Sequence, residues 1–115
     1  MAKRRIWLSY DLGLRGDYQS LYRMLDNLGA DEMGNSAATF MYEAQGIDDD
    51  ECLLNSLKKE IEKYLVVDNN TRIYVIRAIK KDGNIEKIRG TFLYGNRKSN
   101  PWKGCGDSDT PKDDE

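Results

Sequence analysis

The order of secondary structure follows from one segment of the sequence, ADEMGNSAATFMYEA at residues 30–44. From Ala37 to Ala44, the side chains of Ala38, Phe40 and Tyr42 alternate with those of Thr39, Met41 and Glu43. This two-residue period is typical of a strand with one buried face. Asn35 and Ser36 form a turn signal, and residues 30–34 before it predict a short, weak strand. The segment therefore predicts a β-hairpin.

A helix is predicted on each side of this hairpin. Asp17 is a candidate N-cap, Gly29 is a stop signal, and the apolar residues between them fall three or four positions apart: Tyr18, Leu21, Tyr22, Leu25 and Leu28. The acidic run at 48–51 supplies a cap and a first turn that suits the helix dipole. It leads into a second apolar stripe, formed by Leu54, Leu57, Ile61 and Tyr64.

Strands are predicted at both ends of the domain. The first covers residues 4–11 and has one apolar and one mixed face: Ile6, Leu8 and Tyr10 against Arg5, Trp7, Ser9 and Asp11. Residues 71–79 are rich in β-branched and aromatic side chains and predict another strand. A turn at 82–84 leads into a last strand at 85–94, where Gly90 would suit a bulge.

These elements predict an α+β fold, a ferredoxin-like β-α-β-β-α-β sandwich with an additional C-terminal strand. Two helices would cover one face of an antiparallel sheet and leave the other face, with Trp7, Ser9 and Asp11, open for a partner. We place this single domain at residues 1–103 and predict a disordered acidic tail at 104–115, which is rich in Gly, Ser, Pro and acids.

Composition excludes several function classes. The chain of 115 residues has no histidine, so acid–base catalysis by histidine and histidine-containing triads are excluded. Neither a phosphate-binding P-loop nor a dinucleotide-binding glycine motif is present. Cys52 and Cys105 lack the spacing of a metal site. The apolar run after Arg5 ends at Asp11, which indicates no membrane span, and we expect a cytoplasmic protein.

Charge is unevenly distributed along the chain. Residues 107–115 have a formal charge of −4 and the rest +2, and residues 77–103 alone carry +6. Such a basic stretch can follow a phosphate backbone, and it is equally what an edge hairpin carries to avoid pairing with other sheets. The candidate nucleic-acid contacts here are Arg77, Lys80, Lys81, Arg97 and Lys98. Trp102 would either stack on bases among these cations or fold back onto the core.

Asp11 is the candidate metal ligand, because it ends the first strand at the rim of the sheet. Mg²⁺ is commonly held by one or two carboxylates plus water, so a symmetric dimer with two copies of Asp11 would complete a site. Metal-activated water could then attack a phosphodiester. The alternative is that Asp11 only caps the following loop.

The chain resembles a known family in three short motifs and, over roughly residues 4–94, in the order of its elements. Residues 6–11 (IWLSYD), Leu28-Gly29-Ala30 and residues 34–40 (GNSAATF) resemble the CRISPR-associated Cas-two nucleases and the virulence-associated protein D toxins. The resemblance implies a ferredoxin-like homodimer joined through open sheet faces, with Asp11 of each chain at the two-fold axis. It also implies either Mg²⁺-dependent endonuclease activity on RNA or DNA or a non-catalytic scaffold.

The leading hypothesis, a homodimeric nucleic-acid-associated protein of this type, assigns roles to single residues. Asp11 would be the catalytic metal ligand with Ser9 and Tyr10 as supporting neighbours, and Arg15, Arg77, Arg97 and Lys98 would contact phosphates. The competing hypothesis is a non-enzymatic binding or regulatory module that holds a protein or small ligand on the open sheet face. Steep salt dependence is expected of nucleic-acid binding and not of an apolar protein interface.

Overall fold

The computed structural model describes residues 3–43, 49–81, 84–96 and 101–107. Two helices and five strands make up the α+β fold. In chain order they are β1 (Lys3–Asp11), α1 (Tyr18–Asn27), β2 (Asp31–Glu32), β3 (Ala37–Glu43), α2 (Asp50–Glu62), β4 (Arg72–Lys81) and β5 (Asn84–Tyr94).

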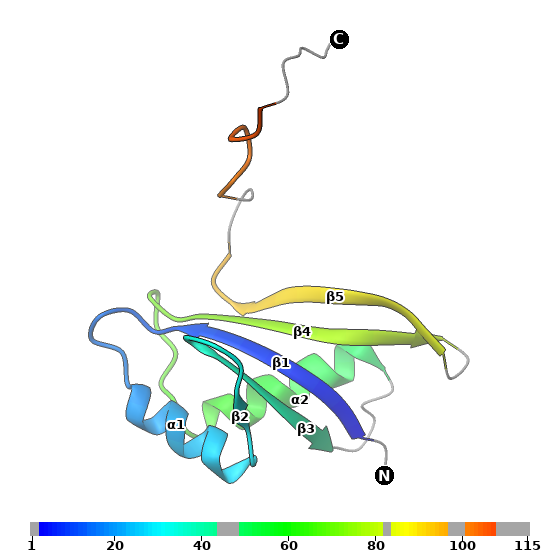
Figure 1. Ribbon diagram of the computed structural model, residues 1–115. Coiled ribbons are helices and arrows are strands. Elements are labelled where there is room, and N and C mark those ends of the chain that lie inside the picture. Colours follow the sequence, from blue (N-terminus) through cyan, green and yellow to red (C-terminus); the bar gives the residue numbers. More distant parts are fainter. Residues whose placement is uncertain (1–2, 44–48, 82–83, 97–100, 108–115) are drawn as a thin grey trace.

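The five strands form one antiparallel sheet with the order β2-β3-β1-β4-β5. Both helices lie on the same face of this sheet, as Figure 1 shows. The arrangement is compatible with a ferredoxin-like fold, and β5 is the additional strand, placed at the edge beside β4. The prediction of two helices on one face of an antiparallel sheet is confirmed.

The core lies between the sheet and the helices. Alternate residues of β1 point into it, and Ile6 and Leu8 are almost completely buried. The helices contribute Leu21, Met24, Leu25, Leu53, Leu57 and Ile61. Full burial of such a side chain contributes about 1.5–3 kcal/mol, so this layer accounts for most of the folding free energy that apolar burial supplies.

Acidic residues begin both helices, as predicted. The Asp17 carboxylate accepts hydrogen bonds from the Ser20 backbone N–H at 3.1 Å and from the Ser20 hydroxyl at 2.6 Å, and these bonds lower the pKa of Asp17. Asp49 caps α2 by accepting from the Glu51 N–H at 3.0 Å. Gly29, with φ of +69°, follows α1 in the left-handed conformation that favours glycine.

The predicted strand boundaries and bulge need correction. β2 is limited to two residues, and β4 begins one residue later and ends two residues later than predicted. Gly90 is not a bulge, since it pairs in register with Ile76, and the irregularities fall near the two ends of the β4–β5 ladder. A side chain at Gly90 would collide with the Tyr74 ring, which explains the glycine.

Part of the predicted tail, residues 108–115, lies outside the described residues, so its disorder stays a prediction. Within the part of the chain that the structure describes, neither helix has the length and apolar character needed to cross a bilayer.

Candidate functional site

The end of β1 separates the three residues predicted to act together. Ser9 and Asp11 are exposed on the open face, whereas Tyr10 points toward the helices and is only 8% exposed. Neighbouring residues of a strand point to opposite faces, so Tyr10 cannot share a site with the other two side chains. Its predicted supporting role beside Asp11 does not fit this geometry.

The Asp11 side chain stabilises the turn that follows β1. One of its carboxylate oxygens, Oδ1, accepts a hydrogen bond from the Gly13 backbone N–H at 2.9 Å, and Gly13 has a φ of +81°. Arg72 of β4 is the cross-strand partner of Asp11. The loop-capping alternative is therefore observed, and it leaves the second oxygen, Oδ2, for another ligand.

The magnesium prediction rests on Asp11 alone within one chain. Among the described ranges there is no group of three or more His, Cys, Asp or Glu side chains that could hold a metal ion. Asp11 alone supplies one carboxylate, the lower end of the one or two that usually hold Mg²⁺ together with water. A second carboxylate at this position would have to come from a residue beyond those described or from another copy of the chain.

Arg77 is not a phosphate contact, because its side chain is buried and only 1% exposed. Its Nε donates to Asp50 Oδ1 at 2.8 Å, and its Nη2 forms an ion pair with Asp50 Oδ2 at 2.5 Å. The Thr91 hydroxyl accepts from Nη1 at 2.7 Å and the Arg89 carbonyl at 3.3 Å. The hydrogen bond from Arg77 lowers the pKa of Asp50. Arg77 thus joins the start of α2 to β4 and β5.

The other predicted nucleic-acid contacts are only partly described. Arg15 is exposed in the loop after β1. The backbone of Lys80 and Lys81 belongs to β4, while Arg97 and Lys98 lie outside the described residues. Trp102 is 68% exposed, so the alternative in which it packs on the core is wrong.

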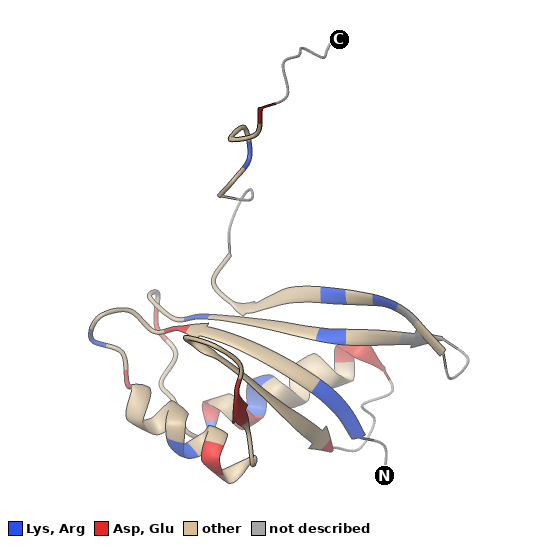
Figure 2. Ribbon diagram, in the orientation of Figure 1, with Lys and Arg blue, Asp and Glu red and all other residues tan. Residues whose placement is uncertain are grey.

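Basic segments of β1, β4 and β5 gather on one half of the sheet, where β1 begins (Figure 2). The strand register divides their side chains between the two faces of the sheet. Lys87 and Arg89 lie on the helix-covered side with Ile6 and Arg77, whereas Lys3 and Arg5 lie on the open face. The exposed cations of these segments are Lys3, Arg5, Lys87 and Arg89. Acidic segments lie on both helices, on β2 and at the ends of β1 and β3, and both helices carry basic segments as well (Figure 2).

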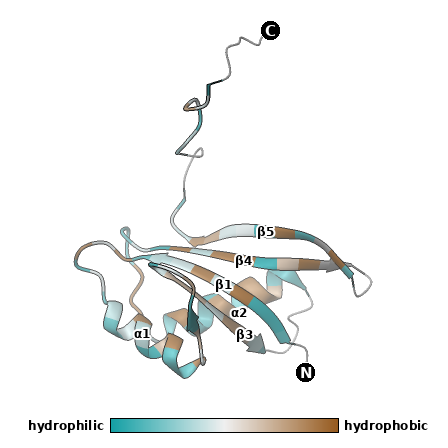
Figure 3. Ribbon diagram, viewed as in Figure 1, coloured by the Kyte–Doolittle hydropathy of each residue, from teal (hydrophilic) through white to brown (hydrophobic). Residues whose placement is uncertain are grey.

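The open face of the sheet carries an apolar patch. Residues in register across the strands share this face, and the apolar ones that define the open-face patch are Trp7, Met41, Tyr74, Ile76, Ile88 and Phe92. All are partly or fully exposed, and the Tyr74 and Phe92 rings pack edge to face at 4.8 Å. Both helices cover the opposite face, and apolar segments continue along β4 and β5 (Figure 3).

Sequence reasoning predicted an open face but missed its apolar patch. The signal was present in β4, where Tyr74, Ile76 and Ala78 alternate with the buried Ile73 and Val75. A strand that is apolar on both faces is typically covered on both. The described elements cover only one.

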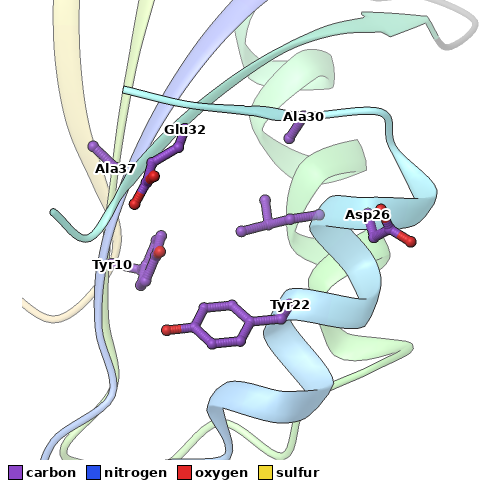
Figure 4. Close-up of a pocket in the computed structure, with 7 residues that line it drawn as sticks. Tyr10, Tyr22, Asp26, Ala30, Glu32 and Ala37 are labelled. Atoms are coloured by element: carbon purple, nitrogen blue, oxygen red, sulfur yellow. The ribbon is translucent and has the colours of Figure 1, made fainter. Parts of the chain in front are cut away.

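A second candidate site is a pocket of about 270 Å³ between α1, β2 and the end of β1. It is lined by Tyr10, Tyr22, Leu25, Asp26, Ala30, Glu32 and Ala37. Figure 4 shows the Tyr22 side chain and the Glu32 carboxylate directed toward Tyr10. Burial, followed by the nearby Tyr22 and then Glu32, raises the pKa of Tyr10. Sequence reasoning did not predict this pocket.

Comparison of the chain with protein-family models, with curated proteins and with solved structures finds no match.

Proposed function

We propose that this chain works as a homodimeric, nucleic-acid-associated protein whose two copies pair through the open sheet face. The observation that carries the proposal is the open-face patch, which the described elements leave uncovered. Patches of this kind mark interaction sites in proteins that are otherwise well packed. The resemblance to the Cas-two family and a ferredoxin-like interpretation of the strand order support a second copy as the occupant.

Charges on the same face favour one relative orientation of the two copies. Lys3 and Arg5 lie at the amino end of β1, and Asp11 lies at its carboxyl end. If the two β1 strands cross the interface in opposite directions, the basic end of each meets Asp11 of the other. Opposite charges that meet across an interface fix its register.

Nucleic-acid association is supported by two exposed cations of β5, on the half of the sheet where β1 begins. Lys87 and Arg89 pair in register with Ile79 and Arg77, so they lie on the helix-covered side and stay outside the proposed interface, and a dimer doubles this pair. Binding that neutralises about four phosphates should fall with salt at a slope of about −3 to −4 in the logarithms of affinity and salt concentration. These residues replace the buried Arg77 as the proposed phosphate contacts.

Metal-dependent cleavage is a second candidate function, and it needs a different dimer. Packed sheets lie about 10 Å apart, so two Asp11 carboxylates can share a hydrated Mg²⁺ only where the two copies of Asp11 face each other. The free Oδ2 of Asp11 favours this candidate. The metal would supply an activated water and would offset the repulsion between the two carboxylates.

The dimer is tested by light scattering of the wild type and of Ile76→Lys, a substitution in the centre of the open-face patch. The wild type is expected at twice the mass of the chain and the variant at the mass of one chain. Val66→Lys is the matched control, because Val66 is 94% exposed and lies outside the patch. A monomeric wild type at all concentrations would sink the proposal.

The variant Asp11→Asn distinguishes the two dimers. Asparagine keeps the oxygen that accepts from Gly13, so the loop is retained while the charge is lost. If Asp11 meets Arg5 of the other copy, the variant weakens the dimer and Mg²⁺ has no effect. If the two Asp11 side chains meet, the variant strengthens the metal-free dimer and abolishes cleavage of labelled RNA or DNA. Asp31→Asn, on the same face, is the control.

A further inference from the structure

The side chains that line the pocket between α1 and β2 are either uncharged or negatively charged. Its polar groups are two tyrosine hydroxyls and the carboxylates of Asp26 and Glu32, and no Lys or Arg is among its lining residues. Tyr10 forms the inner wall with the apolar side chains of Leu25, Ala30 and Ala37. In Figure 4 Asp26 points away from the centre of the pocket, while Glu32 points into it. The pocket is therefore suited to a cation and not to an anion.

No described cation of the chain neutralises this lining. Arg23 is the nearest basic residue along α1, and its guanidinium lies over the Tyr64 ring, 5.5 Å from the ring centroid. The Tyr10 hydroxyl sits beside Tyr22 and Glu32, and the raised pKa of Tyr10 agrees with surroundings that disfavour further negative charge. A positive group would be favoured at the same position.

Aromatic rings supply the second part of the recognition. The rings of Tyr10 and Tyr22 pack edge to face with their centroids 6.2 Å apart, and Tyr22 is 52% exposed. A cation over the face of a tyrosine gains about 0.5–2 kcal/mol, depending on how far it is removed from water. The combination of tyrosine rings with an inward carboxylate favours organic cations, because the rings attract a weakly hydrated cation in addition to the carboxylate.

We propose that this pocket binds an alkylammonium or guanidinium cation. Its volume of about 270 Å³ is below that of pockets for drug-sized ligands and is sufficient for one extended side chain. The cation would come either from a Lys or Arg side chain of a protein partner or from a free polyamine. The site is independent of the open sheet face, because it lies on the helix-covered side of β1.

The proposal is tested by NMR titration of the full chain with N-acetyl-arginine amide, N-acetyl-lysine amide and spermidine. N-acetyl-norleucine amide, which has a similar aliphatic chain and no charge, is the ligand control. Binding is expected at a dissociation constant of about 1 mM for the capped amino acids, with shifts at Tyr10, Tyr22 and Glu32. If spermidine binds more tightly than the capped amino acids, a free polyamine is identified as the source of the cation. If it binds more weakly, a protein side chain is identified as the source.

Two variants and one matched control complete the test. Glu32→Gln is expected to weaken binding roughly 5-fold, because the pocket loses its inward charge at almost constant size. Tyr22→Leu should weaken it roughly 3-fold by removing one ring. Asp31→Asn changes the same charge on the neighbouring residue, whose side chain lies on the other face of β2, and should have little effect.

Three results would overturn the proposal. One is norleucine amide shifting the same resonances as strongly as the cations. Another is an equal loss of affinity in Glu32→Gln and Asp31→Asn, which would indicate general attraction to an acidic surface. The third is the absence of shifts at the lining residues of the folded wild type at 20 mM ligand, about twenty times the expected dissociation constant.

Discussion

The two faces of the sheet carry similar apolar side chains and differ in what covers them. On the helix-covered face Ile6, Leu8 and Val75 are at most 1% exposed. On the open face Trp7 and Ile76, from the same two strands, stay partly exposed. The helices therefore cover one apolar face of the single chain, and the proposed dimer would cover the other.

The largest expected effect comes from deleting side chains on the two faces. Ile6→Ala should lower the free energy of unfolding by about 2–5 kcal/mol, because it leaves a cavity between the sheet and the helices. Ile76→Ala should cost less than about 1 kcal/mol in the single chain, since Ile76 is already partly exposed. Urea unfolding, at a protein concentration below the dissociation constant of the proposed dimer, measures both losses. Equal losses would show that the open face is covered within one chain.

A smaller effect is expected on the helix-covered face, where Arg77 binds Asp50. Asp50→Ala leaves the Arg77 guanidinium buried without its carboxylate and should cost about 2 kcal/mol, below the range for fully buried pairs because Asp50 is 31% exposed. Asp50→Asn keeps one acceptor and should cost less. Thermal unfolding of both variants at pH 7 checks whether Asp50→Ala is destabilised more than Asp50→Asn.

The same pair predicts the pH dependence of stability. The folded pKa of Asp50 lies below its ordinary value of 3.8, so its contribution is complete above that value and is lost as the pH falls through the folded pKa. The wild type should therefore lose stability below about pH 4, and Asp50→Asn should lose less over the same range. Asp17 also has a lowered pKa and should produce the decrease that remains in the variant. Identical acid profiles for the two proteins would contradict this assignment.

The smallest effect on stability is expected at Gly90, on the open face. Alanine there would displace the ring of Tyr74, whose outer end can move toward solvent, so the cost should be below about 1 kcal/mol. The displaced ring would nevertheless change the shape of the open-face patch and weaken the dimer several-fold. Light scattering at several concentrations, compared with urea unfolding, separates the two effects. A large loss of stability with an unchanged dimer would reverse the roles given to the two faces.

Local signals in the sequence predicted much of the fold. Asp17 and the acidic run before α2 begin the helices as expected, and the alternation in β1 assigned Ile6 and Leu8 to the core. These features depend on residues a few positions apart. The two-residue extent of β2 was not predictable in this way, because it depends on pairing with β3.

The candidate sites were less predictable. Counting charges between residues 77 and 103 treated Arg77 as a surface cation, although alternation in β4 places it on the same face as Ile73 and Val75. Applied to β1, the same alternation separates Tyr10 from Asp11. The cation pocket depends on how α1 packs beside β2, and residues distant in sequence form it, so no local pattern contains it.

The position of β5 has a consequence for behaviour at high concentration. As the edge strand of eleven residues it presents backbone groups that could pair with another sheet. Its register with β4 is uninterrupted only between Phe92 and Lys87, and irregularities bend it on both sides. The exposed Lys87 and Arg89 repel an approaching copy of the same edge. Fibril growth from this edge should therefore be slow at low salt and faster where salt screens these charges.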